Sequence, residues 1–334
     1  MKRAIYILLI PILFAGCSKK NITEPQTAIV TINWEQLNYP YPGFVKDIAI
    51  DSIGALYVST PDQGIYFSSD LGENWLNRNV GLPGQYVANL AISDSQSIFA
   101  FVELSSIYRS TNFGMTWSSS IQGRAFHNMI CLRGGLLIAG TYGGDGGGIF
   151  RSTDNGRSWN QVVSDPGILF NTDVADSTGS VLIGTSNGIY KSIDRGSTWT
   201  QSIGILQDEF LTSSTYSEKY GTFVGSNSIG SDTAKIFRST DDGSTWKVVN
   251  PGMAAASIEA LLAVPNGDIY AGTWGKGVFR STDGGQTWIA EQNGLTDMYI
   301  SSIALDKNGI LFVGTYSNWV FRTTKSVLGK TIAN

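Results

Sequence analysis

The stretch from Ser68 to Trp75 reads SSDLGENW, and close copies of it return along the chain. Five further copies end at Trp117, Trp159, Trp199, Trp246 and Trp288. Successive tryptophans therefore lie 42, 42, 40, 47 and 42 residues apart. Self-similarity at a period of about 40 to 50 residues is typical of repeat architectures, in which each repeat is one supersecondary unit. The spacing thus predicts six structural repeats with the same arrangement of elements.

Each copy has the residue types of a tight hairpin turn. Its glycine supplies the positive φ that such a turn needs. Its acidic residue can accept backbone N–H bonds across the turn, and an asparagine keeps part of that ability. The tryptophan is expected to pack between sheets. We interpret the acidic positions as structural, because a catalytic residue is not usually repeated six times around a ring. These positions are Asp70, Asn112, Asp154, Asp194, Asp241 and Asp283.

Each period also holds three other short apolar runs, which predicts four strands per repeat. In the first repeat they are residues 48–51, 56–59 and 64–67. Four strands per period of about 42 residues indicate a blade of a β-propeller. A seventh blade, near residues 297–325, lacks its own tryptophan strand. The segment 29–34 ends at Trp34, 41 residues before Trp75, and can complete that blade. The prediction is an all-β, seven-bladed propeller over residues 28–325, closed by its N-terminal strand and followed by a tail, 326–334.

The repeated motif resembles the BNR or Asp-box repeat, Ser-x-Asp-x-Gly-x-Thr-Trp, of the sialidase-like propellers. The resemblance covers residues 28–325, and in plan it is closest to the single-propeller proteins that resemble the photosystem II assembly factor. It implies that the hairpins lie on one rim. The loops between second and third strands, and the crossings between blades, then lie on the opposite rim. In sialidase-like propellers that opposite rim carries the site.

The first residues predict export and a lipid anchor. A basic start is followed by an apolar run that ends in Phe14-Ala15-Gly16-Cys17, which resembles a bacterial lipobox. We predict a signal peptide over residues 1–16, acylation of Cys17 and a polar tether over residues 17–27. The alternative is an ordinary signal peptide with an incidental cysteine. The predicted location is the bacterial cell envelope, outside the cytoplasmic membrane, on either the periplasmic or the outer-membrane side.

Composition excludes several classes of function. The net charge is −4, and removal of Lys2 and Arg3 with the signal peptide leaves 21 basic and 27 acidic residues, or −6. An acidic surface argues against nucleic-acid binding. Besides Cys17 only Cys131 is present, so the mature chain has neither a disulfide framework nor a cysteine metal site. No dinucleotide fingerprint or phosphate loop occurs, and we expect no cofactor and no metal.

The expected function is non-catalytic binding or assembly with a glycan, peptide or protein of the envelope. Exposed aromatic side chains on a concave rim suit sugar stacking or peptide contacts. The alternative for each aromatic residue is packing between blades. The candidate contact residues are Tyr41, Arg124, Phe126, Tyr142, Trp274, Tyr316 and Trp319.

The enzymatic alternative is a glycoside hydrolase or lyase with two apposed carboxylates on the site rim. Its candidates are Asp145, Asp173, Asp208 and Asp297. Sialidase itself is disfavoured, because most of the ten mature arginines precede or lie inside the hairpins, which leaves too few for a carboxylate-binding cluster. His127 is the single histidine, and a lone histidine is a weak sign of a nucleophilic triad.

Overall fold

The computed structural model describes residues 31–329, apart from 42, 104, 142–145, 166–169, 177, 186–187, 203–205, 207–208, 229–232, 251–252 and 318. The predicted signal peptide, Cys17 and tether lie outside these residues. The described residues from Ile32 onward belong to one compact unit. In the described part, no helix is long and apolar enough to cross a membrane.

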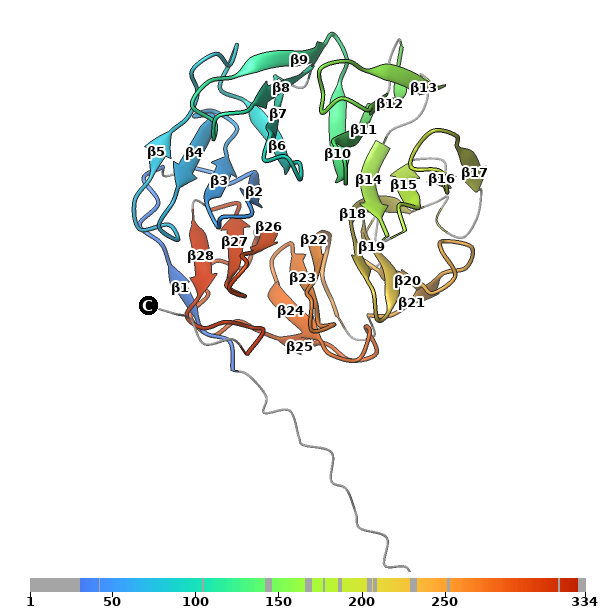
Figure 1. Cartoon of the computed structure of the whole chain (residues 1–334). Helices are drawn as coiled ribbons and strands as arrows, with labels where there is room; N and C mark the ends of the chain where they lie inside the picture. Colours follow the sequence, from blue (N-terminus) through green and yellow to red (C-terminus); the bar gives the residue numbers. More distant parts are fainter. Residues whose placement is uncertain are drawn as a thin grey trace, which may run out of the picture. The chain divides into compact units, whose positions relative to one another are not determined.

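The described strands form seven four-stranded antiparallel sheets arranged in a ring (Figure 1), which confirms the predicted seven-bladed propeller. The inner strands are β2 (Asp47–Ile50), β6 (Val87–Ile92), β10 (Phe126–Leu132), β14 (Phe170–Ala175), β18 (Phe210–Ser217), β22 (Ile258–Ala263) and β26 (Ile300–Leu305). The second strands are β3 (Leu56–Ser59), β7 (Ile98–Val102), β11 (Leu136–Thr141), β15 (Val181–Thr185), β19 (Gly221–Asn227), β23 (Ile269–Thr273) and β27 (Leu311–Thr315).

The two outer layers are shorter and more polar. The third strands are β4 (Ile65–Ser68), β8 (Ser106–Ser110), β12 (Gly148–Ser152), β16 (Gly188–Ser192), β20 (Ile236–Ser239), β24 (Gly277–Ser281) and β28 (Val320–Thr323). The outermost strands are β5 (Leu76–Asn77), β9 (Ser118–Gln122), β13 (Asn160–Ser164), β17 (Thr200–Ser202), β21 (Lys247–Val248), β25 (Ile289–Ala290) and β1 (Trp34–Gln36). The blades are numbered 1 to 7 from the one that begins with β2 to the one that begins with β26.

The N-terminal strand closes the ring as predicted. β1 pairs antiparallel with β28, with Trp34 opposite Thr323, and it completes the sheet of β26 and β27. The Arg322 guanidinium strengthens this closure: its Nε donates to Glu35 of β1 at 2.6 Å, and its Nη1 donates to the Leu71 carbonyl of blade 1 at 2.8 Å. One side chain therefore joins both ends of the ring.

In the six blades that carry the motif, closely similar hydrogen bonds hold the hairpin turn. In blade 4 the Ser192 hydroxyl donates to Asp194 at 2.8 Å, and Asp194 accepts both the amide and the hydroxyl of Thr198 at 2.8 and 2.6 Å. Asn112 keeps the amide contact with Thr116 at 3.0 Å but donates to its hydroxyl instead. The glycines have positive φ, as expected. The residue before each glycine is left-handed too, including four bulky ones at φ 57–59°: Leu71, Phe113, Asn155 and Arg195.

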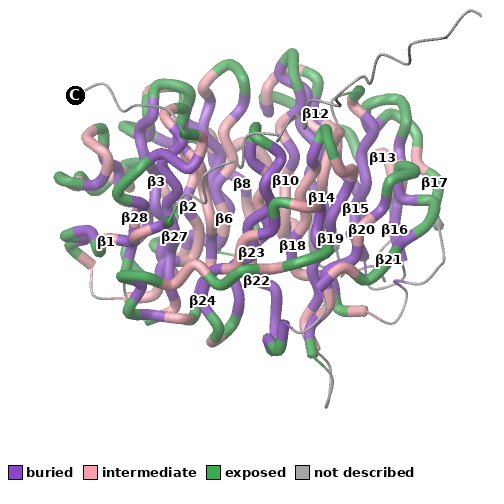
Figure 2. Tube along the Cα trace, turned by 90° about the horizontal axis from the view of Figure 1, so that it is seen from below, coloured by how far each residue is buried: buried purple, intermediate pink, exposed green. Residues whose placement is uncertain are grey.

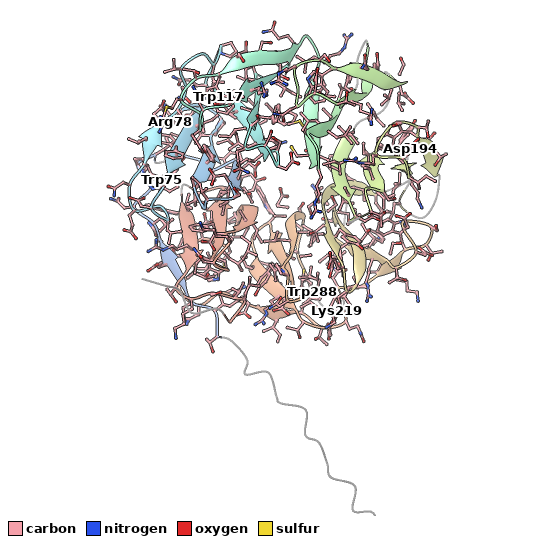
Figure 3. All side chains as sticks on the ribbon, viewed as in Figure 1. Trp75, Arg78, Trp117, Asp194, Lys219 and Trp288 are labelled. Atoms are coloured by element: carbon pink, nitrogen blue, oxygen red, sulfur yellow. The ribbon has the colours of Figure 1, made fainter. Side chains whose placement is uncertain are left out.

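The core lies between neighbouring blades. Six of the seven second strands are buried along their whole length, and β19 is buried except at its two end residues, whereas exposed residues gather at the two rims (Figure 2). Trp117 of blade 2 packs with Tyr57 and Phe67 of blade 1, and its indole N–H donates to the Arg78 carbonyl at 2.8 Å. Trp75, Trp117 and Trp288 occupy the outer part of their blades in Figure 3. Each hairpin tryptophan thus helps to attach its own blade to the preceding one.

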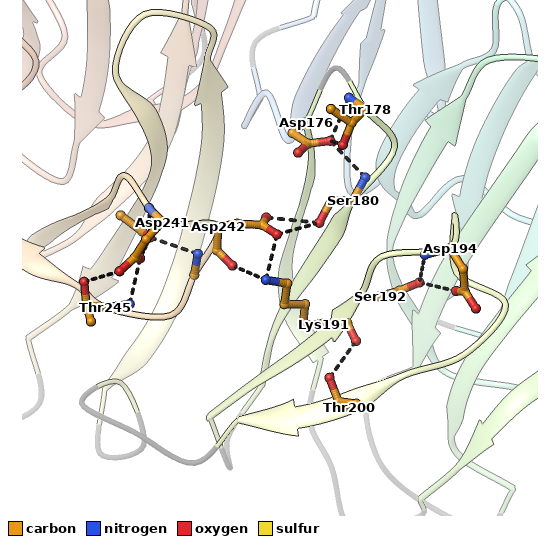
Figure 4. A network of polar contacts seen from close by, with 12 residues as sticks. Asp176, Thr178, Ser180, Lys191, Ser192, Asp194, Thr200, Asp241, Asp242 and Thr245 are labelled. Carbon is orange, nitrogen blue, oxygen red and sulfur yellow. Dashed lines mark hydrogen bonds and ion pairs between the residues drawn. The ribbon is translucent and has the colours of Figure 1, made fainter.

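Polar contacts add to this attachment between blades 4 and 5 (Figure 4). Lys191 Nζ lies 2.6 Å from Asp242 Oδ2 and donates to the Asp242 carbonyl at 2.8 Å. Ser180, in the turn before β15, donates to the same carboxylate at 3.0 Å. The hairpin of blade 5 is therefore fixed to β16 and to the turn before β15 of blade 4.

Candidate functional site

A polar cavity of about 740 Å³ opens on the ring axis, at the end where the inner strands begin. The antiparallel register places the turns between second and third strands at the same end and the repeated hairpins at the opposite end. We call these ends the loop rim and the hairpin rim. The candidate site thus lies on the rim that the sequence predicted. The described polar and charged residues that line the cavity are Lys46, Asp47, Asn89, His127, Asn128, Thr212, Ser213, Ser214, Asn227, Glu259, Ser301, Ser302 and Tyr316.

A β-bulge near the start of the inner strand recurs in six of the seven blades. In blade 6 the register shifts between Ile258 and Ala260, so Glu259 is the extra residue. His127 has the same place in blade 3 and Ser301 in blade 7. A bulge re-aims the side chain of the extra residue. Here it directs polar side chains to the mouth of the cavity.

Several of these residues also join neighbouring blades. Thr212 Oγ1 donates to the Ile258 carbonyl at 2.6 Å, and Ser301 Oγ donates to the Val45 carbonyl at 2.6 Å. Asn89 Nδ2 donates to the His127 carbonyl at 2.5 Å. The mouth is consequently lined by polar groups whose positions are fixed by blade-to-blade hydrogen bonds.

The two described carboxylates of the cavity have different environments. Asp47 accepts the Leu90 amide at 2.9 Å and the Ser302 hydroxyl at 2.9 Å, so it is held between blades 1, 2 and 7. Burial raises the pKa of Asp47, while these hydrogen bonds and Lys46 act in the opposite direction. Glu259 Oε2 accepts the Tyr316 hydroxyl at 2.8 Å. Burial and the negative charge of Glu259 raise the pKa of that phenol.

Basic groups lie on another part of the mouth. Lys46 Nζ is 5.6 Å from the centre of the Phe44 ring, a cation–π contact. Burial, and then the positive charge of Lys46, lowers the pKa of His127 to about 4. The imidazole is therefore neutral at pH 7, and Lys46 is the positive charge on this side of the cavity.

Aromatic side chains extend the site outward from the cavity along the loop rim. Trp274, in the turn between β23 and β24, is 41% exposed, and Tyr299, before β26, is 42% exposed. Their ring centres are 5.2 Å apart. Tyr316 lies 4.6 Å from Trp274 and 4.2 Å from Phe44, centre to centre, and also lines the cavity. Tyr316 thus connects the aromatic surface with the polar mouth.

The residues predicted to bind a ligand differ in where the structure places them. Trp274, Tyr316 and Trp319 share the loop rim of blades 6 and 7, and Trp319 is 38% exposed. Phe126 lines the cavity but is only 3% exposed. Arg124 lies over the ring of Phe150, 5.9 Å from its centre.

Two more residues were predicted to bind a ligand, Tyr41 and Tyr142, and the structure does not place either of them in this site. Tyr41 hydrogen-bonds to Asp62 and stacks 6.2 Å from Tyr66, in the neighbourhood of blade 1. Tyr142 lies outside the described residues.

Of the four carboxylates proposed for hydrolysis, Asp297 alone has a described side chain. It is 7% exposed, and its two oxygens accept the amides of Tyr299 and Ser317 at 3.0 and 3.1 Å. Its observed contacts are those of a residue that holds two loops together. Asp145 and Asp208 lie outside the described residues, as does the side chain of Asp173. No group of three or more His, Cys, Asp and Glu residues suited to a metal occurs among the side chains described.

Asp47 and Glu259 were not predicted from the sequence as site residues. A signal for Glu259 exists: near the start of an inner strand a buried apolar residue is followed by a polar one, as in Val45-Lys46, Phe126-His127, Leu211-Thr212, Ile258-Glu259 and Ile300-Ser301, whereas Asp47 does not follow this pattern. The second residue of each pair lines the cavity.

Comparison with known proteins supports the fold. A family model described as two component regulator propeller matches residues 294–317. A search of the curated proteins gives no match. YCF48 bound to D1 peptide has a TM-score of 0.69 and 17% identity, over 88% of this chain and 97% of that one. Virginiamycin B lyase from Staphylococcus aureus has a TM-score of 0.71 and 15% identity, over 88% of this chain and 99% of the lyase.

A third similar structure is longer than this chain. The GH74 xyloglucanase from Xanthomonas campestris has a TM-score of 0.65 and 16% identity, over 86% of this chain and 52% of the xyloglucanase. The chain therefore spans about half the length of that enzyme. One of these three proteins is bound to a peptide, and the other two are named as enzymes. At identities of 15–17%, the similarity to this chain shows the seven-bladed propeller fold alone.

Proposed function

We propose that the chain is a non-catalytic binding scaffold that holds an extended peptide segment of a partner protein across the loop rim. The proposal rests on one observation. Trp274 and Tyr299 form an exposed aromatic surface, and Tyr316 connects it with the polar cavity, because Tyr316 contacts Trp274 and also lines the cavity. Binding sites combine such apolar contact area with a few fixed polar groups. The mouth supplies these groups already held in place, so little ordering is needed on binding.

Two further points support a peptide rather than turnover. YCF48, whose structure is similar over nearly its full length, is bound to D1 peptide. The described carboxylates of the cavity, Asp47 and Glu259, accept hydrogen bonds from protein groups. The similarity to a GH74 xyloglucanase supports the second candidate, cleavage of a polysaccharide, and the experiment below includes that outcome.

We further infer that the repeats belong to the BNR or Asp-box class and that the protein is anchored in the bacterial envelope through lipid on Cys17. The support is the hairpin motif at six positions and the apolar run before Cys17. An anchored propeller would be available to partners in the envelope.

The test uses the full chain in detergent, a library of random nine-residue peptides and a panel of polysaccharides. We expect retention of peptides without turnover of any polysaccharide. Replacement of both Trp274 and Trp319 by Ala is expected to abolish retention. The matched control, Phe113→Ala, removes a 43% exposed aromatic side chain from the hairpin rim and should retain binding. Turnover of a polysaccharide, or retention that survives the double replacement, would refute the proposal.

A further inference from the structure

Trp274, Tyr299 and Tyr316 form an aromatic corner on the loop rim. The planes of Trp274 and Tyr299 meet at 81°, and those of Trp274 and Tyr316 meet at 67°. Trp274 and Tyr299 each keep about two fifths of their surface exposed. Both pairs are edge-to-face contacts, so the exposed rings form a corner rather than one flat stacking platform, and a corner suits a compact group better than the flat face of a sugar ring.

Glu259 places a carboxylate at the inner edge of the corner. Its Oε2 is 2.8 Å from the Tyr316 hydroxyl, and the bulge in β22 directs it to the cavity mouth. Both oxygens of a carboxylate accept hydrogen bonds, and one bond from Tyr316 leaves further acceptor capacity. Aromatic faces and a carboxylate beside each other attract a cation through the ring quadrupoles and through direct charge pairing.

The net charge of the whole protein also favours the binding of a cation. Its net charge is −4 and its pI is about 5.1, so an approaching basic segment is attracted and an acidic one repelled. Two described lysines lie near this part of the rim: Lys46, which contacts Phe44, whose ring stacks on Tyr316, and the exposed Lys276, two residues after Trp274 in the same turn. The Glu259 carboxylate, which accepts the Tyr316 hydroxyl, is the group that makes the corner favour a cation in spite of these lysines.

The geometry points to a cationic side chain, Lys or Arg, as the group that the aromatic corner accepts from the bound peptide, with Glu259 as its counter-ion. This inference rests on the proposed peptide-binding function and specifies the chemistry of the peptide. It distinguishes a basic segment from an apolar or acidic one that would use the same rim.

The test compares three versions of the random nine-residue library, with Lys, norleucine or Glu fixed at the central position. The full chain in detergent should enrich the Lys version over the norleucine version and exclude the Glu version. Glu259→Gln keeps an acceptor for Tyr316 but removes the charge, so affinity for a selected Lys peptide should fall about tenfold. Glu218→Gln, an exposed carboxylate on the hairpin rim, is the control and should have no effect.

Two more variants test the aromatic contribution. Trp274→Phe keeps a π face and should keep the preference for Lys over norleucine, whereas Trp274→Leu should lose it while still binding both weakly. Equal enrichment of the Lys and norleucine versions, or a preference that Glu259→Gln leaves unchanged, would overturn this inference and leave the peptide-binding proposal intact. Retention of no peptide in any version would refute both.

Discussion

The Tyr316 hydroxyl donates a 2.8 Å hydrogen bond to Glu259 Oε2, and this bond joins the loop rim of blade 7 to the inner strand of blade 6. Tyr316 is itself packed between Phe44 of blade 1 and Trp274 of blade 6. The residue therefore sets the position of a carboxylate and of two aromatic rings at once. Loss of the Tyr316 side-chain contacts should therefore alter the geometry of the site more than the stability of the propeller.

Tyr316→Phe tests this relationship. The ring contacts remain, but Glu259 loses a donor, and the loss of one hydrogen bond should reduce the free energy of unfolding by about 1 kcal/mol. The urea midpoint measures this change. Tyr299→Phe, at a largely exposed position, is the matched control and should leave the midpoint unchanged. Equal midpoints for both variants would show that the Tyr316–Glu259 bond contributes nothing to stability.

Arg322→Met should weaken closure of the ring. Arg322 donates to Glu35 of β1 and to the Leu71 carbonyl and Glu73 of blade 1, at 2.6, 2.8 and 2.7 Å. Because both carboxylates are partly exposed, water screens the pairs, and we expect a loss of about 1–3 kcal/mol.

Amide hydrogen exchange locates the effect of Arg322→Met. Faster exchange should appear in β1 and β28 first, because local opening of those strands becomes easier. Arg157→Met, an exposed hairpin arginine, is the control. Unchanged exchange in β1 would contradict a closing role for Arg322.

The sequence predicted the blades and their closure because the repeated hairpin has a local cause. Serine, aspartate and glycine at fixed spacing make one turn, and a tryptophan after it needs the neighbouring blade for burial. Glu259 could not be found in the same way, since a bulge adds a residue and breaks the alternation of buried and exposed positions in β22. Asp297 was a candidate for one of two apposed carboxylates on the site rim; its oxygens accept two backbone amides, a contact that depends on how two loops meet.

Trp117→Ala tests the attachment of one blade to the next. Trp117 is 6% exposed and packs on Tyr57 and Phe67 of the preceding blade. Removal of a buried indole, with an unpaired Arg78 carbonyl left behind, should cost about 3–5 kcal/mol. Trp159→Ala should cost less, since Trp159 is only partly buried. The melting temperature of each variant checks the order, and a reversed order would show that indole burial does not control this attachment.

Cys17→Ala tests the proposed anchor. If Cys17 carries lipid, incorporation of labelled palmitate should disappear in the variant, and the chain should leave the membrane fraction. Cys131→Ala, within β10, is the control and should keep the label. Label that persists in Cys17→Ala would exclude attachment at this residue and leave the propeller assignment unaffected.

The acidic residues of the hairpins should make stability depend on pH below about 4. Hydrogen bonds from the Thr198 hydroxyl and amide and from Ser192 lower the pKa of Asp194 to about 2, and similar bonds lower the pKa of Asp154 and Asp241 to about 2. An unfolded aspartate has a pKa near 3.9, so between these values the unfolded chain binds more protons than the folded one. The stabilising contribution is therefore complete above pH 4 and is lost as the pH falls toward 2.

Asp194→Asn isolates one of these carboxylates. The amide can still hold the turn, as Asn112 does in blade 2, but it no longer titrates. Urea midpoints measured from pH 5 to pH 2.5 should fall for the unmodified protein and fall less steeply for Asp194→Asn. Glu218→Gln, exposed in a turn between β18 and β19, should keep the full slope. The same slope in Asp194→Asn as in the unmodified protein would mean that the hairpin hydrogen bonds do not favour the charged form, and that the turn depends on the backbone conformation of Arg195 and Gly196 instead.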